Sequence, residues 1–484
     1  MVYLLAWGYL HWFQFLTPYL SEPDPHYHIK AAWLMRTQGI LRDFPWAEHS
    51  IWREAWFNKD FGFHVLLLPF TRGDLVGGAK LAAVTYGAAV FTSFFAVLRL
   101  SGVRHAWFWT LLLFCAGSFW GYRVNVARPQ LISIICSLWV VLFVIRRSPL
   151  GVGVLTFLFA LGYAAPHVAV GYAIIFWLAV GLRDGRFAPW LPLAALAGWM
   201  LGWVVHPNFP DTFAGWWIQN VNVLQASWSA SAPALGMAAE LHPADTRSLL
   251  LEHIPLVTLA LGAVLLWPHV SDRSDPRLVT ILIVGLGYAL LTMLSKRFIE
   301  LSVPFGIWGI AAIFTSAGPT LARLGWRAKV PAVLALVLVM GIGGYRTAVN
   351  NRALFSTLSY QGIPTASRWL FENTPRDSLI FTCDWDDAPE LFLYNHRNRY
   401  MVFLDPMFMY AWRPTLFETW RTVAQGQHVK PVETIRDAFG AAGGFCTGNF
   451  GRLRRQLEAD GRVRLEGRPG GVYVFVFEDE ERDE

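Results

Sequence analysis

The chain has 484 residues, of which 55% are hydrophobic and 15% charged, and its mean hydropathy is +0.38. A typical soluble protein has about 25% charged residues, so this composition excludes an ordinary soluble protein and indicates a polytopic α-helical membrane protein. The formal net charge of +6 is no sign of a nucleic-acid partner, because the basic residues lie in short connections between apolar runs.

Several apolar runs approach the roughly 20 residues that a helix needs to cross a bilayer. Taken between charged breaks, they predict a membrane domain over residues 1–345 with eleven spans. These cover about 2–20, 76–98, 106–121, 130–145, two short spans that meet near His167 within 149–182, then 188–205, 254–269, 278–295, 301–317 and 330–345. The first span begins at Val2 without a basic leader, so we expect it to be retained rather than cleaved.

Basic residues in the connections between these spans predict the orientation. If the N-terminus is cytoplasmic, every cytoplasmic connection is basic, as the positive-inside rule requires. The residues concerned are Arg99, Arg104, Arg146, Arg147, Arg183, Arg186, Arg273, Arg277, Arg323, Arg327 and Lys329. The first loop (21–64), the long loop 206–253 and the region 346–484 then lie on the outer, periplasmic side of a cell inner membrane.

The first loop holds the strongest candidate for chemistry. Asp24 directly follows the first span, between Pro23 and Pro25, and a carboxylate at the mouth of a membrane cavity can act as a general base toward a hydroxyl group. The alternative is that Asp24 caps a helix that begins near His26; the two roles are compatible. His28 lies four residues after Asp24 and shares its helix face.

A second cluster in the first loop contains Glu54, Lys59 and Asp60. Its plain alternative is the polar face of an interfacial helix. His28 has several open roles, as a metal ligand, an acid, a phosphate contact or a polar surface residue. The sequence contains no HExxH-like or CxxC-like spacing, so a divalent metal is an open option and not a requirement.

Cations at predicted outer helix ends suit an anionic lipid phosphate, which arginine can bind with two parallel hydrogen bonds. Arg128 follows Arg123 in one outer connection, and Arg297 lies in another, three residues before Glu300, with which we expect it to pair. The alternative for each arginine is a side chain that only extends to the membrane surface. Two further residues, His167 and His206, either bond to helix ends or line the site.

Strands alternate with helices after residue 346, which predicts a small α/β domain with an acidic tail. Asp384 and Asp386 follow the first predicted strand, a usual place for a site; the alternative is a solvated loop with a helix cap. Cys383 and Cys446 could form a disulfide if this domain lies outside the cytoplasm.

These features resemble the GT-C glycosyltransferases, which include protein O-mannosyltransferases, aminoarabinose transferases and oligosaccharyltransferase catalytic subunits. The resemblance rests on the first loop with PDPHYHIKAAWLMRTQG, the eleven spans, RFIE at 297–300 and the outer domain. It implies a sugar donor on a polyprenyl phosphate or pyrophosphate, with Asp24 as the base or acceptor-binding carboxylate and Asp60 as the nearest match to a second acidic position. The chain lacks the WWDYG of oligosaccharyltransferases, which favours a monophosphate-linked donor and metal independence.

The sequence therefore predicts a glycosyltransferase that moves a sugar, with inversion, to a lipid, glycan or protein acceptor outside the membrane. Arg297, Arg128 and Lys59 would stabilise the departing lipid phosphate. The alternatives are a transporter or flippase for a lipid-linked glycan and a non-enzymatic assembly subunit. A transporter usually has internal repeats, which are not evident here, and an assembly subunit leaves Asp24 and Arg297 unexplained. The identities of sugar and acceptor stay open.

Overall fold

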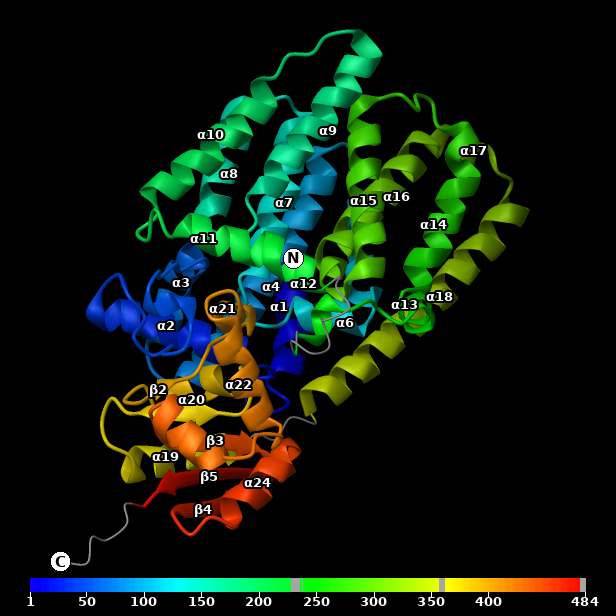
Figure 1. The fold of residues 1–484 in the computed structure, drawn as a ribbon. Coiled ribbons are helices and arrows are strands. Elements are labelled where there is room, and N and C mark those ends of the chain that lie inside the picture. Colours follow the sequence, from blue (N-terminus) through cyan, green and yellow to red (C-terminus); the bar gives the residue numbers. More distant parts are fainter. Residues whose placement is uncertain (228–235, 237, 357–361, 479–484) are drawn as a thin grey trace, which may run out of the picture.

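The computed structural model describes residues 1–227, 236, 238–356 and 362–478 (Figure 1). Part of the predicted long loop, 228–235 and 237, and the end of the predicted acidic tail, 479–484, lie outside the described residues. A bundle of helices forms one half of the molecule, and a small α/β domain, yellow to red in Figure 1, forms the other end. Helices α2 (Asp24–Gln38) and α3 (Phe61–Leu67) of the first loop lie between the two parts.

Five helical segments in the described part of the chain are long and apolar enough to cross a membrane, and a pair bent by 84° makes a sixth if it counts as one span. The five are α4 (Leu75–Leu100), α9 (His167–Asp184), α15 (Pro276–Leu294), η7–α16 (Lys296–Ser316) and α18 (Trp326–Ser356). The bent pair is α13 (Thr246–Glu252) with α14 and η6 (Ile254–His269). Shorter apolar segments are α3–η2 (Phe61–Thr71), α5–η3 (Ala106–Cys115), α7 (Gln130–Ile145), α8 (Pro149–Gly162) and α10 (Trp190–Val205). Each predicted apolar run contains a helix, and the count of eleven spans stays a prediction.

Two predicted span boundaries were wrong. Helix α1 (Val2–Gln14) ends before the predicted limit at residue 20, because Pro18 disfavours helical backbone at the residue before it. The predicted span 106–121 is broken at Gly117, whose φ is +93°. A Cβ there would lie 3.0 Å from His253 Nε2, so only glycine fits this turn. The short helix α6 (Ser118–Arg123) then starts in a new direction.

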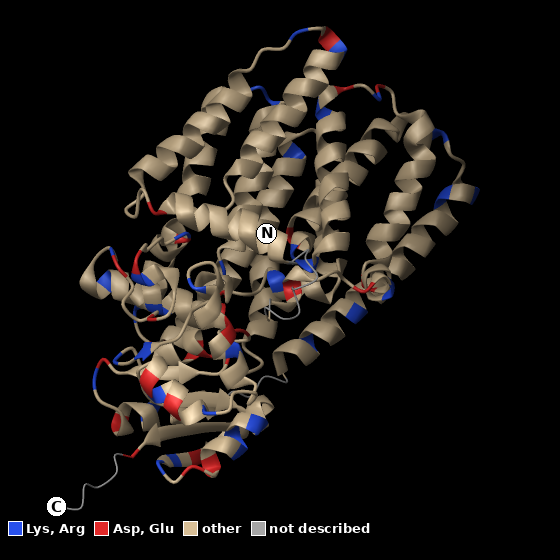
Figure 2. Ribbon diagram, viewed as in Figure 1, with Lys and Arg blue, Asp and Glu red and all other residues tan. Residues whose placement is uncertain are grey.

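Charged residues gather at the two ends of the helical bundle and in the α/β half, and few lie between (Figure 2). The connections predicted to be cytoplasmic meet at one end. Arg183 pairs with Asp272 at 2.8 Å, Arg146 donates to the Leu100 carbonyl at 2.6 Å, and the Arg104 amide donates to Thr315 Oγ1 at 3.1 Å. The basic connections therefore share one end of the bundle, opposite the α/β domain, as the positive-inside reasoning requires.

The remaining helical elements connect the spans. They are η1 (Ile51–Arg53), α11 (Thr212–Trp217), the π-helix η4 (Ile218–Asn222), α12 (Val223–Ser227), η5 (Ala239–Leu241) and α17 (Gly318–Arg323). Four of them, α11 to η5, lie in the predicted long loop 206–253.

The α/β domain has a five-stranded sheet of order β2-β1-β3-β5-β4. β1 (Leu379–Thr382) runs parallel to β2 (Arg399–Tyr400) and to β3 (Ala441–Thr447), whereas β5 (Val472–Phe477) runs antiparallel to β3 and to β4 (Val463–Arg468). A disulfide joins Cys383 to Cys446, at the end of β1 and in β3. The helices are α19 (Gly362–Asn373), α20 (Asp387–Tyr394), α21 (Met407–Tyr410), α22 (Pro414–Ala424), α23 (Pro431–Glu433), the π-helix η8 (Thr434–Ala438), η9 (Gly448–Phe450), α24 (Gly451–Glu458) and η10 (Pro469–Gly471).

The first loop is built into this domain. Ala47 forms a parallel bridge with Tyr400, and the Tyr400 amide donates to the Trp46 carbonyl at 2.8 Å. The aromatic side chains of the loop enter the core of the domain, so that Phe44 packs on Phe392 and Phe403. Burial of this apolar surface fixes helix α2, and with it Asp24, against the domain.

Candidate active site

A polar cavity of about 270 Å³ lies where the first loop, the connection between α6 and α7, the turns η5 and η7, and the α/β domain meet. Its charged lining residues are Glu22, Asp24, Lys59, Arg128, Glu240, Arg297, Asp386 and Asp405. Five of these were predicted from the sequence as site residues: Asp24, Lys59, Arg128, Arg297 and Asp386. The fold thus brings together residues more than 350 positions apart.

Asp24 is the first residue of α2, and its carboxylate faces Arg128. Asp24 Oδ2 lies 2.8 Å from Arg128 Nη2, and the same guanidinium contacts Glu22 Oε2 at 2.6 Å and Glu240 Oε2 at 3.2 Å. The side chain of Arg128 is only 12% exposed. The helix has no side-chain cap, and its N-cap residue is Pro23, so the capping alternative for Asp24 is wrong. Its charge still suits the positive end of the helix.

Arg123 occupies a deeper position behind the cavity. Its Nε donates to Glu300 Oε1 at 2.6 Å, and a terminal nitrogen contacts Glu240. Arg297 lies 3.9 Å from Glu240 Oε1 and donates to the Tyr163 hydroxyl at 3.1 Å. We call Arg123, Arg128 and Arg297 the arginine cluster.

The predicted pair between Arg297 and Glu300 is wrong. Arg297 lies in the 3-10 turn η7, whereas Glu300 lies in α16 (Ile299–Ser316), so the two do not share one regular helix face. Each finds a partner from a distant segment instead, and Glu300 neutralises Arg123. Glu300 therefore supports the cavity from behind and is not among the residues that line it.

The carboxylates around Arg128 differ in their electrostatics. Burial raises the pKa of Glu22 above its usual range, despite the guanidinium of Arg128. Burial alone would also raise the pKa of Glu240. The combined positive charge of Arg123, Arg128 and Arg297 has the larger effect and holds the pKa of Glu240 well below its usual range. Glu240 is therefore firmly ionised.

Three other carboxyl groups, two in the cavity wall and one behind it, also have raised pKa values. Burial raises the pKa of Asp60, which pairs with Lys59 at 3.0 Å. Burial also raises the pKa of Asp386, and the neighbouring Asp384 adds to the shift. The pKa of Asp405 is raised by burial, although Gln219 donates to its carboxylate at 3.1 Å.

Several predicted site residues lie outside the cavity. Glu54 is exposed and lies 3.9 Å from Arg413 at the surface; it follows the three-residue turn η1 and does not lie on the interfacial helix of the alternative. Asp60 is buried behind Lys59, and Asp384 lies beside Asp386 without lining the cavity.

The three histidines have structural partners. His28 is buried with its Nδ1 2.9 Å from His64 Nε2. His167 accepts from the Trp216 indole at 3.0 Å, and His206 Nε2 lies 3.1 Å from the Asn58 carbonyl oxygen. None of the three lines the cavity. Among the described residues, no group of three or more His, Cys, Asp or Glu side chains is arranged to hold a metal ion.

Comparisons with solved structures identify the fold of this chain. No family model matches the sequence, and no curated protein sequence matches it. The Archaeoglobus fulgidus oligosaccharyltransferase, solved with a tethered acceptor peptide that contains the NVT sequon, superposes with a TM-score of 0.66 at 12% identity, over 99% of this chain and 74% of that one. ArnT from Cupriavidus metallidurans, bound to undecaprenyl phosphate, superposes with a TM-score of 0.56 at 12% identity, over 98% and 97% of the two chains.

The chain has the fold of the GT-C glycosyltransferases. The resemblance drawn from the first loop and the RFIE segment is thereby confirmed for the fold. The archaeal oligosaccharyltransferase AglB, solved with an inhibitory peptide and a dolichol-phosphate, gives a TM-score of 0.64, also at 12% identity.

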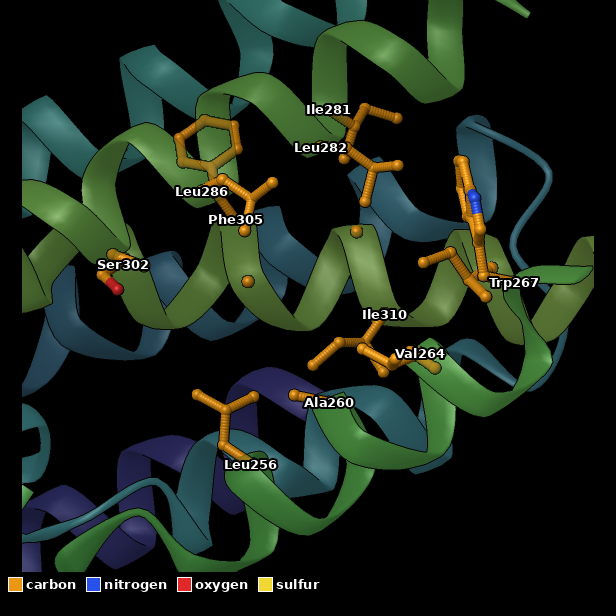
Figure 3. A pocket seen from close by; sticks show the side chains of 16 residues that line it. Leu256, Ala260, Val264, Trp267, Ile281, Leu282, Leu286, Ser302, Phe305 and Ile310 are labelled. Atoms are coloured by element: carbon orange, nitrogen blue, oxygen red, sulfur yellow. The ribbon is translucent and has the colours of Figure 1, made fainter. Parts of the chain in front are cut away.

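In this GT-C fold a second cavity, of about 490 Å³, lies between α14 (Ile254–Leu266), α15 and α16 (Figure 3). Small and aliphatic side chains make up most of its lining, together with Phe305, and Ser302 and Trp267 lie toward its two ends in Figure 3. Ser302 follows Glu300 by two residues on α16. The apolar cavity therefore runs along the same helix that carries Glu300 at its outer end.

Three charged residues that line the polar cavity, Glu22, Glu240 and Asp405, are absent from the predicted site residues. Glu22 lies two positions before Asp24 and was overlooked beside it. Glu240 lies in the apolar stretch GMAAELHP, and an isolated acid in such surroundings is the signal that could have identified it.

Proposed function

We propose that this chain is a membrane glycosyltransferase that moves a sugar from a polyprenyl-phosphate donor to an acceptor hydroxyl group on the outer side of the cell inner membrane. The observation that carries the proposal is the polar cavity, in which Asp24 lies 2.8 Å from Arg128 in a chain with the GT-C fold. A carboxylate next to a group of arginines offers a base for the acceptor and cations for a phosphate leaving group.

In the proposed reaction, Asp24 accepts the proton of the acceptor hydroxyl group while the hydroxyl oxygen attacks the anomeric carbon of the sugar. The bond between that carbon and the phosphate oxygen breaks with inversion, and the polyprenyl phosphate leaves with the bonding electrons. Arg128 and Arg297 stabilise the negative charge on the departing phosphate, together with Lys59, which also lines the cavity. Acceptors that suit this chemistry are a lipid, a glycan or a protein.

The donor chain has a suitable site in the apolar cavity between α14, α15 and α16. Burial of isoprenoid surface there is favourable at about 25 cal/mol per Å². Similarity to ArnT, whose structure holds undecaprenyl phosphate, supports a lipid phosphate as ligand. The carboxylates near Arg128 are each tied to a guanidinium, which supports a reaction that relies on arginine charge.

Mass spectrometry of cells with and without the gene tests the proposal. We expect loss of the gene to accumulate one polyprenyl-linked sugar and to remove one sugar modification from an envelope component. If the donor accumulates on the cytoplasmic side of the membrane, the flippase alternative is supported instead. If no lipid-linked sugar changes, the proposed transfer is refuted and an assembly role is favoured.

A further inference from the structure

Glu240 has a special place in the arginine cluster. Its carboxylate contacts Arg123, reaches Arg128 with both oxygens at 3.2 and 3.3 Å, and lies 3.9 Å from Arg297. No other carboxylate in the described part of the chain contacts all three arginines. Glu240 thus occupies the point on which the cations of the cavity converge, where an anionic ligand would bind best.

The cluster has no spare positive charge for such a ligand. Three guanidinium groups face the carboxyl groups of Glu22, Asp24, Glu240 and Glu300, so each guanidinium already has at least one carboxyl partner. A phosphate that entered this arrangement unchanged would meet repulsion. One carboxylate must therefore leave the arginines when a phosphate binds.

The contacts with the arginines single out Glu240 as that carboxylate, because its departure alone would free positive charge on Arg123, Arg128 and Arg297. Asp24 and Glu300 lie on the regular helices α2 and α16, and the backbone carbonyl of Glu22 bonds to His26 Nδ1 at 3.0 Å. Glu240 instead lies on η5, a three-residue turn. Two hydrogen bonds tie this turn to the neighbouring segment, from Ser295 Oγ to the Glu240 carbonyl and from the Lys296 amide to the His242 carbonyl, both at 3.1 Å.

We propose that Glu240 holds the place of the donor phosphate, and that the phosphate binds to Arg128 and Arg297 by displacing the Glu240 carboxylate. The inference rests on the proposed function. A phosphodiester that links a sugar to a lipid has one negative charge, like the carboxylate it replaces, so the exchange leaves the charge of the cluster unchanged. A pyrophosphate would add a further negative charge. Glu240 therefore selects donors with a single phosphate.

The test is the affinity of the purified full chain for a polyprenyl-phosphate-linked sugar, a phosphodiester with one negative charge, measured by native mass spectrometry and by quenching of tryptophan fluorescence in detergent. Glu240→Gln removes the competing charge and leaves three guanidinium groups facing three carboxyl groups. We expect the variant to bind about tenfold more tightly or better, since one charge-assisted contact no longer has to be broken. Glu240→Asp keeps the negative charge, so its affinity for the lipid should stay within about threefold of the wild-type value. A threefold change corresponds to less than half of the free energy expected for one charge-assisted contact.

Glu252→Gln is the matched control, because Glu252 accepts hydrogen bonds from Ser118 and has no contact with the arginine cluster. Its affinity should stay at the wild-type value. If Glu240→Gln binds this phosphodiester equally or more weakly while its melting temperature is retained, Glu240 has only a structural role and the inference is overturned. If the wild type and all variants fail to bind the lipid, the proposed function itself is refuted.

Discussion

Substitution of Asp24 by asparagine separates the chemistry of its carboxylate from its place in the ion network. Arg128 keeps its contacts with Glu22 at 2.6 Å and Glu240 at 3.2 Å after the change, and an asparagine oxygen can still accept from the guanidinium. The loss of stability should therefore stay within the ~1.5–3 kcal/mol of one hydrogen bond to a charged group. A positioned general base contributes about 10²–10⁴-fold in rate, equivalent to about 3–5 kcal/mol.

The assay is sugar transfer in proteoliposomes with a polyprenyl-phosphate-linked donor, alongside the melting temperature of each variant. We expect Asp24→Asn to lose at least about 100-fold in rate. Glu22→Gln is the matched control, because Glu22 is also buried against Arg128. The transfer rate of this variant should stay within about tenfold of the wild-type rate, which corresponds to the loss of about one weak contact. Full activity of Asp24→Asn would falsify the assignment of the base. Equal losses in both variants would show that the ion network matters rather than Asp24.

Three further predictions concern stability. Arg123→Met leaves the buried Glu300 without its cation, so unfolding should become easier by about 3–5 kcal/mol, and an unchanged melting temperature would contradict the ion pair. Burial raises the pKa of Glu390 from 4.5 to about 8, so the folded state keeps a proton that the unfolded chain releases, and stability falls as pH rises from about 4.5 to 8. Glu390→Gln should therefore raise the melting temperature at pH 9 and leave it nearly unchanged at pH 5; an equal shift at both values refutes the titration. Cys446→Ser opens the disulfide with Cys383, 63 positions away in sequence, and should cost about 4 kcal/mol in the chain-entropy account, which denaturation with and without reductant measures.

Features that depend on neighbouring residues could be predicted from the sequence. Hydropathy is a property of local composition, so every predicted apolar run contains a helix, and the basic connections lie together at one end of the bundle. The break between α8 and α9 near His167 was also predicted, because proline interrupts the helix there. The strands of the α/β domain follow the same local logic, since β-branched and aromatic residues form short runs between turns.

Pairing across the fold could not be predicted in this way. Arg123 and Glu300 are 177 positions apart, so only the packing of α6 against α16 decides that they meet. Sequence spacing suggested Arg297 as the partner of Glu300 instead. A pair three residues apart is favourable only when both residues lie on one regular helix, and these two do not. Glu54 was a candidate for the same reason as Lys59, its charge in the first loop, yet the two point to different surroundings.

The union of the first loop with the α/β domain has a consequence for the order of folding. Trp46 Nε1 donates to the His396 carbonyl across 350 positions, and Phe44 packs on Phe403. These aromatic side chains have no core to enter until the last quarter of the chain has been synthesised. Contacts of such long range form late, so helix α2 takes its final position last. A ribosome that stops early would therefore leave a complete set of membrane helices without a formed polar cavity.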